Sequence, residues 1–300
     1  MQKLRSILAA VDTISQNRAV LARAAELARA HDAKLTIVHI SDVPVPPGAV
    51  AADQQLVQEQ ALILDQKRVE EEIGSLDLSD ISVTIRVESG SPPSRIVEIA
   101  NELHVDLIVM RAHQRRSFRE KLIGSTADRV LRSTSSSVLI VKRPVEHAYR
   151  NVFVAIDFLD DSESAAIRSA DIFPDIKLVL VHVIEVTARF ERALANAGYG
   201  DAKVKAFKRQ AARYVDNRMR DLLTRVSDRK PAPRSRVLIG DPAQSLVQVS
   251  RNAGTELIAV GSAGYSAIRL ALLGSVTQRL IREADSDVLI SRTPAPTIVK

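Results

Sequence analysis

Residues Val260–Leu280 read VGSAGYSAIRLALLGSVTQRL, a glycine loop that leads into a helical stretch. Two residues lie between Gly261 and Gly264, and nine lie between Gly264 and the pair formed by Gly274 and Ser275. Glycine lets a ligand approach the backbone closely, and the free N–H groups at a helix N-terminus favour an anion. Taken alone, such glycines more simply shape turns, and Ser275 would only cap a helix. The spacing nevertheless marks a candidate phosphate site.

The matching stretch of the first half, Met110–Val130, reads MRAHQRRSFREKLIGSTADRV. Its spacing is the same, but Arg111 and Gln114 replace the first two glycines, whereas Gly124 and Ser125 remain. Side chains at these positions restrict φ and occupy the space where a ribose or phosphate would lie. We interpret this loop as a degenerate site kept for structure. The alternative is an anion site that uses the charge of Arg111.

The two loops belong to a longer repeat. Gly124–Pro144 and Gly274–Pro294 agree at 9 of 21 positions. The first predicted strands, ILAAVD and VFVAID, end at Asp12 and Asp157. Because the matches keep the same order in both halves, the chain is a tandem duplication.

Each half alternates short apolar runs with helical stretches, which predicts parallel strands with helices on both faces of the sheet. The expected fold class is α/β, with two tandem doubly wound five-stranded parallel-sheet domains over residues 1–145 and 150–300. Ligands of such sheets bind beyond the carboxyl ends of the strands. The predicted strands are 5–11, 34–40, 81–88, 105–111 and 137–142, then 151–157, 176–184, 234–240, 256–261 and 287–292. The predicted helices are 15–30, 52–75, 93–103 and 121–133, then 162–172, 190–227, 243–253 and 273–284.

The composition narrows the possible chemistry. The sequence has no cysteine, which excludes disulfides, thiolate nucleophiles and cysteine-ligated zinc. Its six histidines show no metal-ligand spacing, and no Walker A, G-x-S-x-G or HExxH motif occurs. We therefore predict no catalytic residue and no metal site. The N-terminus lacks the apolar run of a signal peptide and no segment is long enough for a membrane span, so we expect a cytoplasmic protein.

The net charge of +6 is distributed unevenly. Val50–Asp80 carries 8 acidic and 2 basic residues, whereas Arg189–Arg236 carries 14 basic and 5 acidic residues. A solvated helix face is the simpler interpretation of each stretch. The alternative hypothesis is that the two faces approach each other, within one chain or between chains. The apolar face predicted for the second of these helices comprises Val204, Phe207, Ala211, Tyr214, Met219, Leu222 and Val226.

Nucleic-acid binding through the basic stretch is a weaker interpretation of its charge. A single-strand binding surface combines basic residues with aromatic side chains on which the bases stack. We expect no aromatic residues to punctuate the basic face in this way, and we therefore do not expect nucleic acid as a partner.

The pattern G-x2-G-x9-G-[S/T], set in a tandem α/β repeat, resembles the universal stress protein family. Gly261, Gly264, Gly274 and Ser275 fill this pattern. Met110–Gln114 is similar to the M-x-A-H-Q segment of the two-domain E type of that family, and the resemblance covers the whole chain. It implies a Rossmann-like fold of the adenine nucleotide alpha hydrolase kind, with the two domains related by a pseudo-twofold axis.

The resemblance also implies which residues hold a nucleotide. In ATP-binding members, the aspartate after the first strand and the residue after the histidine of the second strand face adenine. The glycines and the following Ser-Val hold ribose and phosphates. The cofactor-binding residues would be Asp157, Val183, Gly261, Gly264, Gly274, Ser275 and Val276. The degenerate first site would comprise Asp12, Ile40, Arg111, Gln114, Gly124 and Ser125.

The leading hypothesis is a tandem universal stress protein that binds ATP, with or without Mg²⁺, at one intact site in the C-terminal domain. It would act as a stress-response regulator, with at most slow ATP hydrolysis. The alternative is a non-catalytic module that binds another ligand or a partner without depending on ATP. An adenylate-handling enzyme is disfavoured because the SGGxDS and HIGH-type motifs are missing.

The fifth strands of the two domains bear on assembly. Val138–Lys142 and Val288–Arg292 would be sheet edges if left alone, and proteins cover or pair exposed edges. Fifth strands in the resembling family pair across a dimer. The resemblance therefore implies an internal pseudo-dimer through the fifth strands, which could dimerise further as a homodimer.

Overall fold

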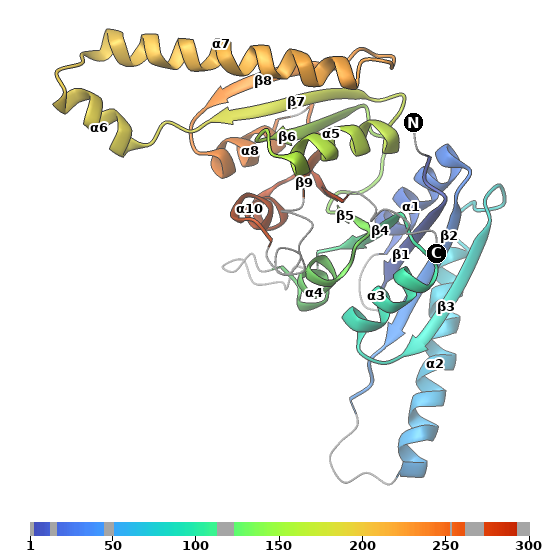
Figure 1. The fold of residues 1–300 in the computed structure, drawn as a ribbon. Helices are drawn as coiled ribbons and strands as arrows, with labels where there is room; N and C mark the ends of the chain where they lie inside the picture. Colours follow the sequence, from blue (N-terminus) through green and yellow to red (C-terminus); the bar gives the residue numbers. More distant parts are fainter. Residues whose placement is uncertain are drawn as a thin grey trace, which may run out of the picture. The chain divides into compact units, whose positions relative to one another are not determined.

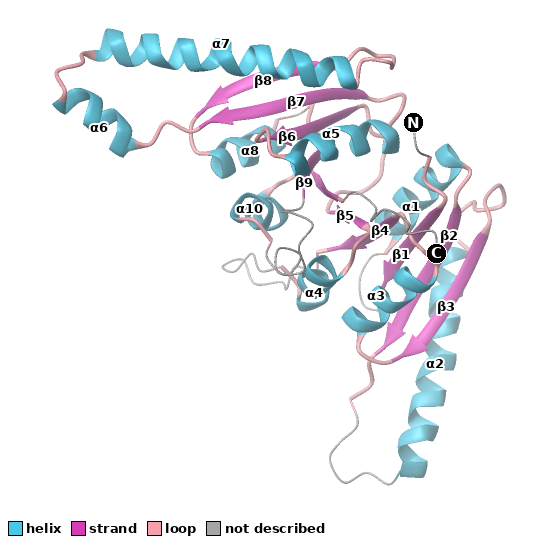
Figure 2. Cartoon of the chain, viewed as in Figure 1, coloured by secondary structure: helices cyan, strands magenta, loops and turns pink. Residues whose placement is uncertain are grey.

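The computed structural model describes residues 3–12, 17–44, 51–112, 123–252, 254–261 and 273–292. These residues form two compact α/β units, one running to Ala148 and the other starting at Tyr149 (Figure 1). Each unit alternates strands and helices along the chain, as Figure 2 shows by colour. The predicted α/β class is confirmed.

The first unit has five parallel strands in the order β3-β2-β1-β4-β5. Ile7 lies between Leu35 and Leu107 in the register of the three central strands, and all three side chains are buried. The elements are β1 (Ser6–Val11), α1 (Arg18–His31), β2 (Lys34–Ser41), α2 (Ala51–Ile73), β3 (Val83–Ser89), α3 (Pro92–Glu102), β4 (Leu107–Arg111), α4 (Ser125–Ser133) and β5 (Ser137–Val141).

The second unit repeats this topology, with strands in the order β8-β7-β6-β9-β10, all parallel. Val152 lies between Leu178 and Leu257 in the register, and these side chains are buried. The elements are β6 (Asn151–Ile156), α5 (Asp160–Ile172), β7 (Lys177–Ile184), α6 (Ala188–Asn196), α7 (Asp201–Arg225), β8 (Arg234–Ile239), α8 (Pro242–Ser250), β9 (Leu257–Gly261), α10 (Ser275–Glu283) and β10 (Asp287–Ser291).

The strand order places a topological switch point in each unit. In the first unit, β1, β2 and β3 follow one another toward one edge of the sheet, whereas β4 and β5 follow one another toward the other edge. The crossovers that leave the neighbouring strands β1 and β4 therefore run toward opposite edges. The same holds for β6 and β9. Ligands of open α/β sheets bind at this point, beyond the carboxyl ends of the strands. Asp12 and Arg111 lie there in the first unit, and Asp157 and Gly261 lie there in the second.

The single helix predicted for 190–227 is wrong, because two helices occupy this stretch. α6 ends at Asn196, and Gly198 then adopts a φ of 79°, a conformation that glycine accepts readily. α7 begins after Gly200, which is its N-cap residue. The helical stretch is therefore interrupted where its glycines permit a turn. The two helices form a hairpin, which is visible in Figure 1.

The predicted apolar face of α7 is correct only for its C-terminal half. Met219, Leu222 and Val226 are buried, but Phe207 is 42% exposed and Tyr214 is 64% exposed. In Figure 1 the N-terminal half of α7 extends beyond the carboxyl ends of the strands of its own unit. No sheet lies beneath that half of the helix, so its aromatic side chains stay in solvent.

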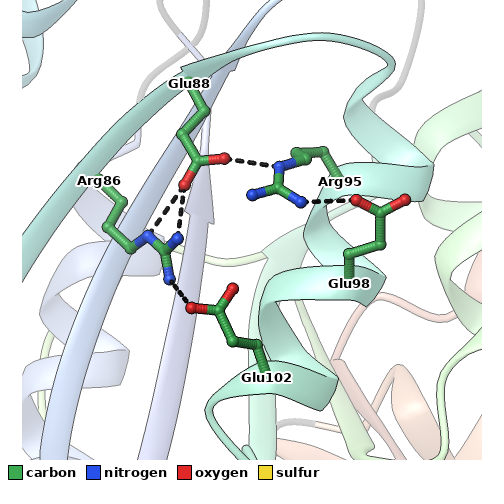
Figure 3. A network of polar contacts seen from close by, with 5 residues as sticks. All are labelled: Arg86, Glu88, Arg95, Glu98 and Glu102. Carbon is green, nitrogen blue, oxygen red and sulfur yellow. Dashed lines mark hydrogen bonds and ion pairs between the residues drawn. The ribbon is translucent and has the colours of Figure 1, made fainter.

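An ion-pair network joins β3 to α3 in the first unit (Figure 3). Glu88 accepts from Arg86 at 2.8 Å and from Arg95 at 2.6 Å. Arg86 also pairs with Glu102 at 3.2 Å, and Arg95 pairs with Glu98 at 2.6 Å. Burial alone would raise the pKa of Glu88, but the hydrogen bond from Arg95 and the charges of both arginines outweigh it and lower this pKa.

Candidate functional site

Asp157 lies at the carboxyl end of β6 in a loop of three residues before α5. Its backbone N–H donates to Oγ of Ser162 at 3.2 Å, and its Oδ1 accepts from the backbone N–H of Leu159 at 3.0 Å. These bonds hold the aspartate in a fixed turn while its side chain stays exposed. An exposed carboxylate at the switch point can accept hydrogen bonds from the polar edge of a ligand.

An aromatic stack stands beside this aspartate. The ring of Phe158 lies 4.7 Å from the ring of His182, and the guanidinium of Arg218 lies 4.3 Å above the Phe158 ring. Nδ1 of His182 donates to the carbonyl of Ile156 at 2.7 Å, which fixes the end of β7 against β6. The next residue on β7, Val183, is only 9% exposed.

Phe158 was missed as a site residue by sequence reasoning, although a signal for it exists in the structure. It has a φ of 62°, which a bulky residue adopts only at a cost. Residues in such conformations cluster at ligand sites and switch regions, where the surrounding contacts hold them. The stack with His182 and Arg218 supplies those contacts. No pattern in the sequence predicts this backbone conformation.

Gly261 has to be glycine for a packing reason that the sequence did not reveal. A Cβ at this position would come within 2.7 Å of the backbone oxygen of Asp161, in the first turn of α5. Backbone atoms cannot move aside as a flexible side chain would. The end of β9 and the first turn of α5, which begins three residues after Asp157, are therefore packed as closely as glycine allows.

The N-terminus of α10 offers free backbone donors. Its N-cap is Gly274, which has no side chain to cap the first turn, and a Cβ there would meet open space. Ser275 is exposed and Val276 is half-buried. The first turn contains no acidic residue, so the N–H groups and the helix dipole are available to an anion. Gly264, the remaining predicted glycine, lies outside the described residues.

The first unit keeps part of this arrangement. Asp12 donates its backbone N–H to Oδ1 of Asn17 at 3.1 Å, as Asp157 does to Ser162. Ile40 is buried at the end of β2, in the place that Val183 has on β7. Asp12 and Ile40 thus lie where Asp157 and Val183 lie in the second unit.

The first unit differs at the phosphate end. Arg111, half-buried at the end of β4, has the position of Gly261. Gly124 and Ser125 begin α4 as their counterparts begin α10, but the first turn of α4 contains Asp128, which pairs with Arg132 at 2.8 Å. A carboxylate at this position disfavours a bound anion. Gln114 lies outside the described residues.

The long helix of each unit is anchored beside the site. In the first unit, Glu72 of α2 accepts from the backbone N–H of Asn17 at 3.0 Å and from its side-chain amide at 2.8 Å. Asp65 of the same helix lies 3.3 Å from Nε2 of His39. Nδ1 of His39 donates to the carbonyl of Val11 at 3.0 Å. Acidic residues of α2 therefore hold it against the ends of β1 and β2.

Basic residues do the same in the second unit. Arg225 of α7 pairs with Glu163 of α5 at 2.5 Å, and Arg218 lies 3.8 Å from the same carboxylate while it stacks on Phe158. Arg218 and Arg225 are seven residues apart, as are Asp65 and Glu72. That spacing, two helical turns with opposite charge, was present in the sequence but was not recognised.

Two properties concern the described residues as a whole. Within them, no helix is both long and apolar enough to cross a membrane. The same residues contain no group of three or more histidine and acidic side chains arranged to hold a metal ion.

Comparison with family models identifies both halves of the chain. The model of the universal stress protein family matches residues 3–142 and again residues 148–292. A universal stress protein of Mycobacterium tuberculosis is 24% identical over 310 residues, covering 97% of this chain and 98% of its own length. Universal stress protein A homolog 1 of Coxiella burnetii is 30% identical over 145 residues, covering 46% of this chain and 95% of its own length.

Solved structures show the same fold. The crystal structure of a universal stress protein from Archaeoglobus fulgidus superposes with a TM-score of 0.68 at 15% identity, covering 96% of this chain and 98% of that chain. A protein of Pseudomonas aeruginosa, described as functionally unknown, superposes with a TM-score of 0.63 at 16% identity, covering 97% of this chain and 93% of its own. Both likenesses extend across the two units.

Proposed function

The chain belongs to the universal stress protein family as a tandem of two domains, and from this premise we propose that its second domain binds ATP while its first domain carries an altered site. The observation that supports this proposal is that Asp157 and Gly261 lie at the carboxyl ends of β6 and β9, while α10, the next described helix after β9, begins without a side-chain cap. An adenine and a triphosphate need those two kinds of partner, a polar acceptor and anion-binding N–H groups.

Each residue of the proposed site has a separate task. Asp157 and Val183 would hold the adenine, one by hydrogen bonding and the other by apolar contact. Gly274, Ser275 and Val276 would bind phosphate through the backbone N–H groups of α10, with the hydroxyl of Ser275 as a further donor. Gly261 and Gly264 would leave room for the ribose. Mg²⁺, where present, would be held chiefly by the phosphates.

The proposed role is regulatory rather than catalytic. We expect the bound nucleotide to bias a conformation or an assembly in a stress response, with hydrolysis slow at most. α7 is placed to report occupancy because Arg218 stacks on Phe158, the residue next to Asp157. A ligand that moves Phe158 would alter this contact.

Isothermal titration with ATP tests the proposal through a pair of matched variants. Ser275→Glu places a carboxylate at the exposed start of α10, where it stabilises the helix but repels phosphate. Ser125→Glu makes the same change at the start of α4. We expect one ATP per wild-type chain, binding weakened at least about tenfold in Ser275→Glu, at about 1.4 kcal/mol per factor of ten, and no change in Ser125→Glu. Failure of the wild type to bind, or equal losses in both variants, would refute the proposal.

A module independent of ATP is the second candidate function. The observation that favours it is the exposure of apolar side chains on α2 and on the α6–α7 hairpin, which is typical of interaction surfaces. Mass spectrometry of small molecules carried through purification separates the two candidates. A co-purified adenine nucleotide supports the first, whereas another ligand at stoichiometric amounts supports the second.

A further inference from the structure

Along its first fourteen residues, α2 exposes an apolar stripe. Leu56, Val57, Ile63 and Leu64 are between 49% and 61% exposed. Because they are one and seven residues apart, they lie on one side of the helix, opposite buried Val69. In Figure 1 the N-terminal end of α2 extends beyond the strands of its own unit. We call these four residues the α2 stripe.

Acidic residues surround the α2 stripe. Residues 51–66 contain three acidic side chains and no basic one. Asp53 and Glu59 are exposed, and Asp65 faces His39. A shallow groove lined by Leu62, Ile63, Gln66, Lys67, Glu70 and Val87 continues the apolar surface toward β3. The α2 stripe is therefore flanked by the exposed acidic residues Asp53 and Glu59, which form its acidic rim, whereas the groove carries one basic and one acidic residue, Lys67 and Glu70.

The α6–α7 hairpin exposes the opposite kind of surface. Four of the ten aromatic residues in the chain lie on it, and each is at least 37% exposed: Phe190, Tyr199, Phe207 and Tyr214. The rings of Phe190 and Phe207 lie 4.9 Å apart, and Nζ of Lys203 lies 4.0 Å above the ring of Tyr199. Residues 188–214 contain seven basic and two acidic side chains. This result corrects the expectation that no aromatic residues accompany the basic stretch.

We propose that the α2 stripe of one molecule docks against the α6–α7 hairpin of a second copy. Aromatic side chains beside basic ones fit an apolar stripe with an acidic rim, and complementary charge sets both the choice of partner and the association rate. Pairing of two α2 stripes, or of two hairpins, would place like charges together and is disfavoured. This contact involves neither strand ends nor nucleotide and goes beyond the proposed function.

A second copy fits the observations better than other occupants. A basic, aromatic hairpin also has the chemistry to bind an anionic lipid surface or a nucleic acid. Either partner would repel the acidic rim of α2 and leave the α2 stripe exposed. Contact between copies covers both surfaces at once. Because the two surfaces differ, a dimer closes only where both contacts form reciprocally; otherwise association continues beyond a dimer until a ring closes.

Sedimentation velocity without nucleotide tests the proposal. Arg209→Glu with Arg213→Glu reverses two exposed charges on the hairpin, and Asp53→Lys with Glu59→Lys reverses two beside the α2 stripe. We expect the wild type to self-associate, more weakly as salt rises, and each double variant to lose association at least about tenfold, at about 1.4 kcal/mol per factor of ten. An equimolar mixture of the two variants should associate again, because each reversed surface then meets a complementary one.

Two controls make the outcome decisive. Arg234→Glu with Arg236→Glu reverses two exposed charges on β8 and should leave association unchanged. Leu56→Ser with Ile63→Ser should abolish association without unfolding the protein, whereas Ile239→Ser, at another exposed apolar residue, should not. A monomeric wild type at about 100 µM, the concentration scale of a weak specific contact, would overturn the proposal. So would a mixture that fails to associate, or a hairpin variant that loses only vesicle or nucleic-acid binding.

Discussion

The long helices α2 and α7 have equivalent places in the two units, but residues of opposite charge anchor them. α2 uses Asp65 and Glu72 to reach His39 and Asn17. α7 uses Arg218 and Arg225 to reach Phe158 and Glu163. Four residues after the first anchor both helices bury an apolar residue, Val69 in α2 and Leu222 in α7, and α7 also buries Met219 between its anchors.

This difference in anchoring charge shows that the fold requires the buried residue on the long helix but tolerates either sign of charge. Both helices need a buried residue between the two anchors because an apolar face must pack on the sheet. The sign of the anchoring charge is free to change as long as its partner changes too. In the first unit the acidic anchor Glu72 is paired with the amide of Asn17, and in the second the basic anchor Arg225 is paired with the carboxylate of Glu163. The long helices of the two units can thus differ in the sign of their charge while the two units keep the same topology.

The largest expected effect concerns the buried half of α7. Replacing Leu222, which is 2% exposed, with alanine should lower the free energy of unfolding by about 2–5 kcal/mol, because it removes buried methyl groups and leaves a cavity. Tyr214→Ala should change it by less than about 0.5 kcal/mol, because that side chain lies in solvent. Urea unfolding followed by circular dichroism measures both. Equal losses would mean that the apolar face runs the full length of the helix.

The next effect distinguishes two glycines of the proposed site, Gly261 and Gly274. Gly261→Ala should cost about 1–3 kcal/mol, because its Cβ would lie 2.7 Å from the backbone oxygen of Asp161. Gly274→Ala should be within about 0.5 kcal/mol of the wild type, because its Cβ meets open space. Thermal unfolding checks the pair. A stable Gly261→Ala protein would show that this glycine is present for the ligand alone.

A smaller effect compares the anchors themselves. Glu72→Ala should cost about 1–2 kcal/mol, since it removes two hydrogen bonds from Asn17 at the start of α1. Glu163→Ala should cost at most about 1 kcal/mol, because its partner Arg225 is half-exposed and the pair is screened by solvent. Chemical unfolding of each variant, with wild type alongside, decides. The reverse order would show that the basic anchors, not the acidic ones, are the stronger.

The hydrophobic periodicity of the sequence predicted the strands and the fold class, whereas features that depend on packing were not predicted. The apolar runs predicted every strand and the doubly wound class, because a buried parallel strand needs a continuous apolar run. The helix predicted over 190–227 failed because Gly198 and Gly200 break it, and the faces of α7 failed because the sheet ends beneath it.

The candidate site was predicted only as a set of positions. Gly261 and the start of α10 were predicted from the loop spacing, Asp157 from its place after the first strand, and Val183 from the family resemblance. Asp157 and Gly261 lie at the carboxyl ends of β6 and β9. The Phe158 stack, the contact of Gly261 with α5 and the anchors of α2 and α7 each arise between residues far apart in sequence. Nothing in one local pattern could reveal them.

The ion-pair network on β3 and α3 is not repeated at the corresponding described positions of the second unit. Glu88 pairs with Ile40 in the register, and Leu238 pairs with Val183, so Leu238 has the place of Glu88. Ser245 is the third residue after Pro242 in α8, as Arg95 is after Pro92 in α3. The second unit folds with an apolar and a small polar residue at these positions. The network therefore adds to a fold that does not depend on it.

The smallest expected effect on stability concerns Glu88 in this ion-pair network. Glu88→Gln should cost about 0.5–1 kcal/mol at pH 7, because the carboxylate is partly exposed. The pKa of Glu88 is lowered in the folded state, so its stabilisation is complete above the pKa of the unfolded chain and is lost as the pH falls through the lower, folded value. The gap between variant and wild type should thus shrink below about pH 4.5. Glu185→Gln removes the same charge elsewhere and should show no gap at pH 7. A gap for Glu88→Gln that persists at low pH would show that the network acts through packing rather than charge.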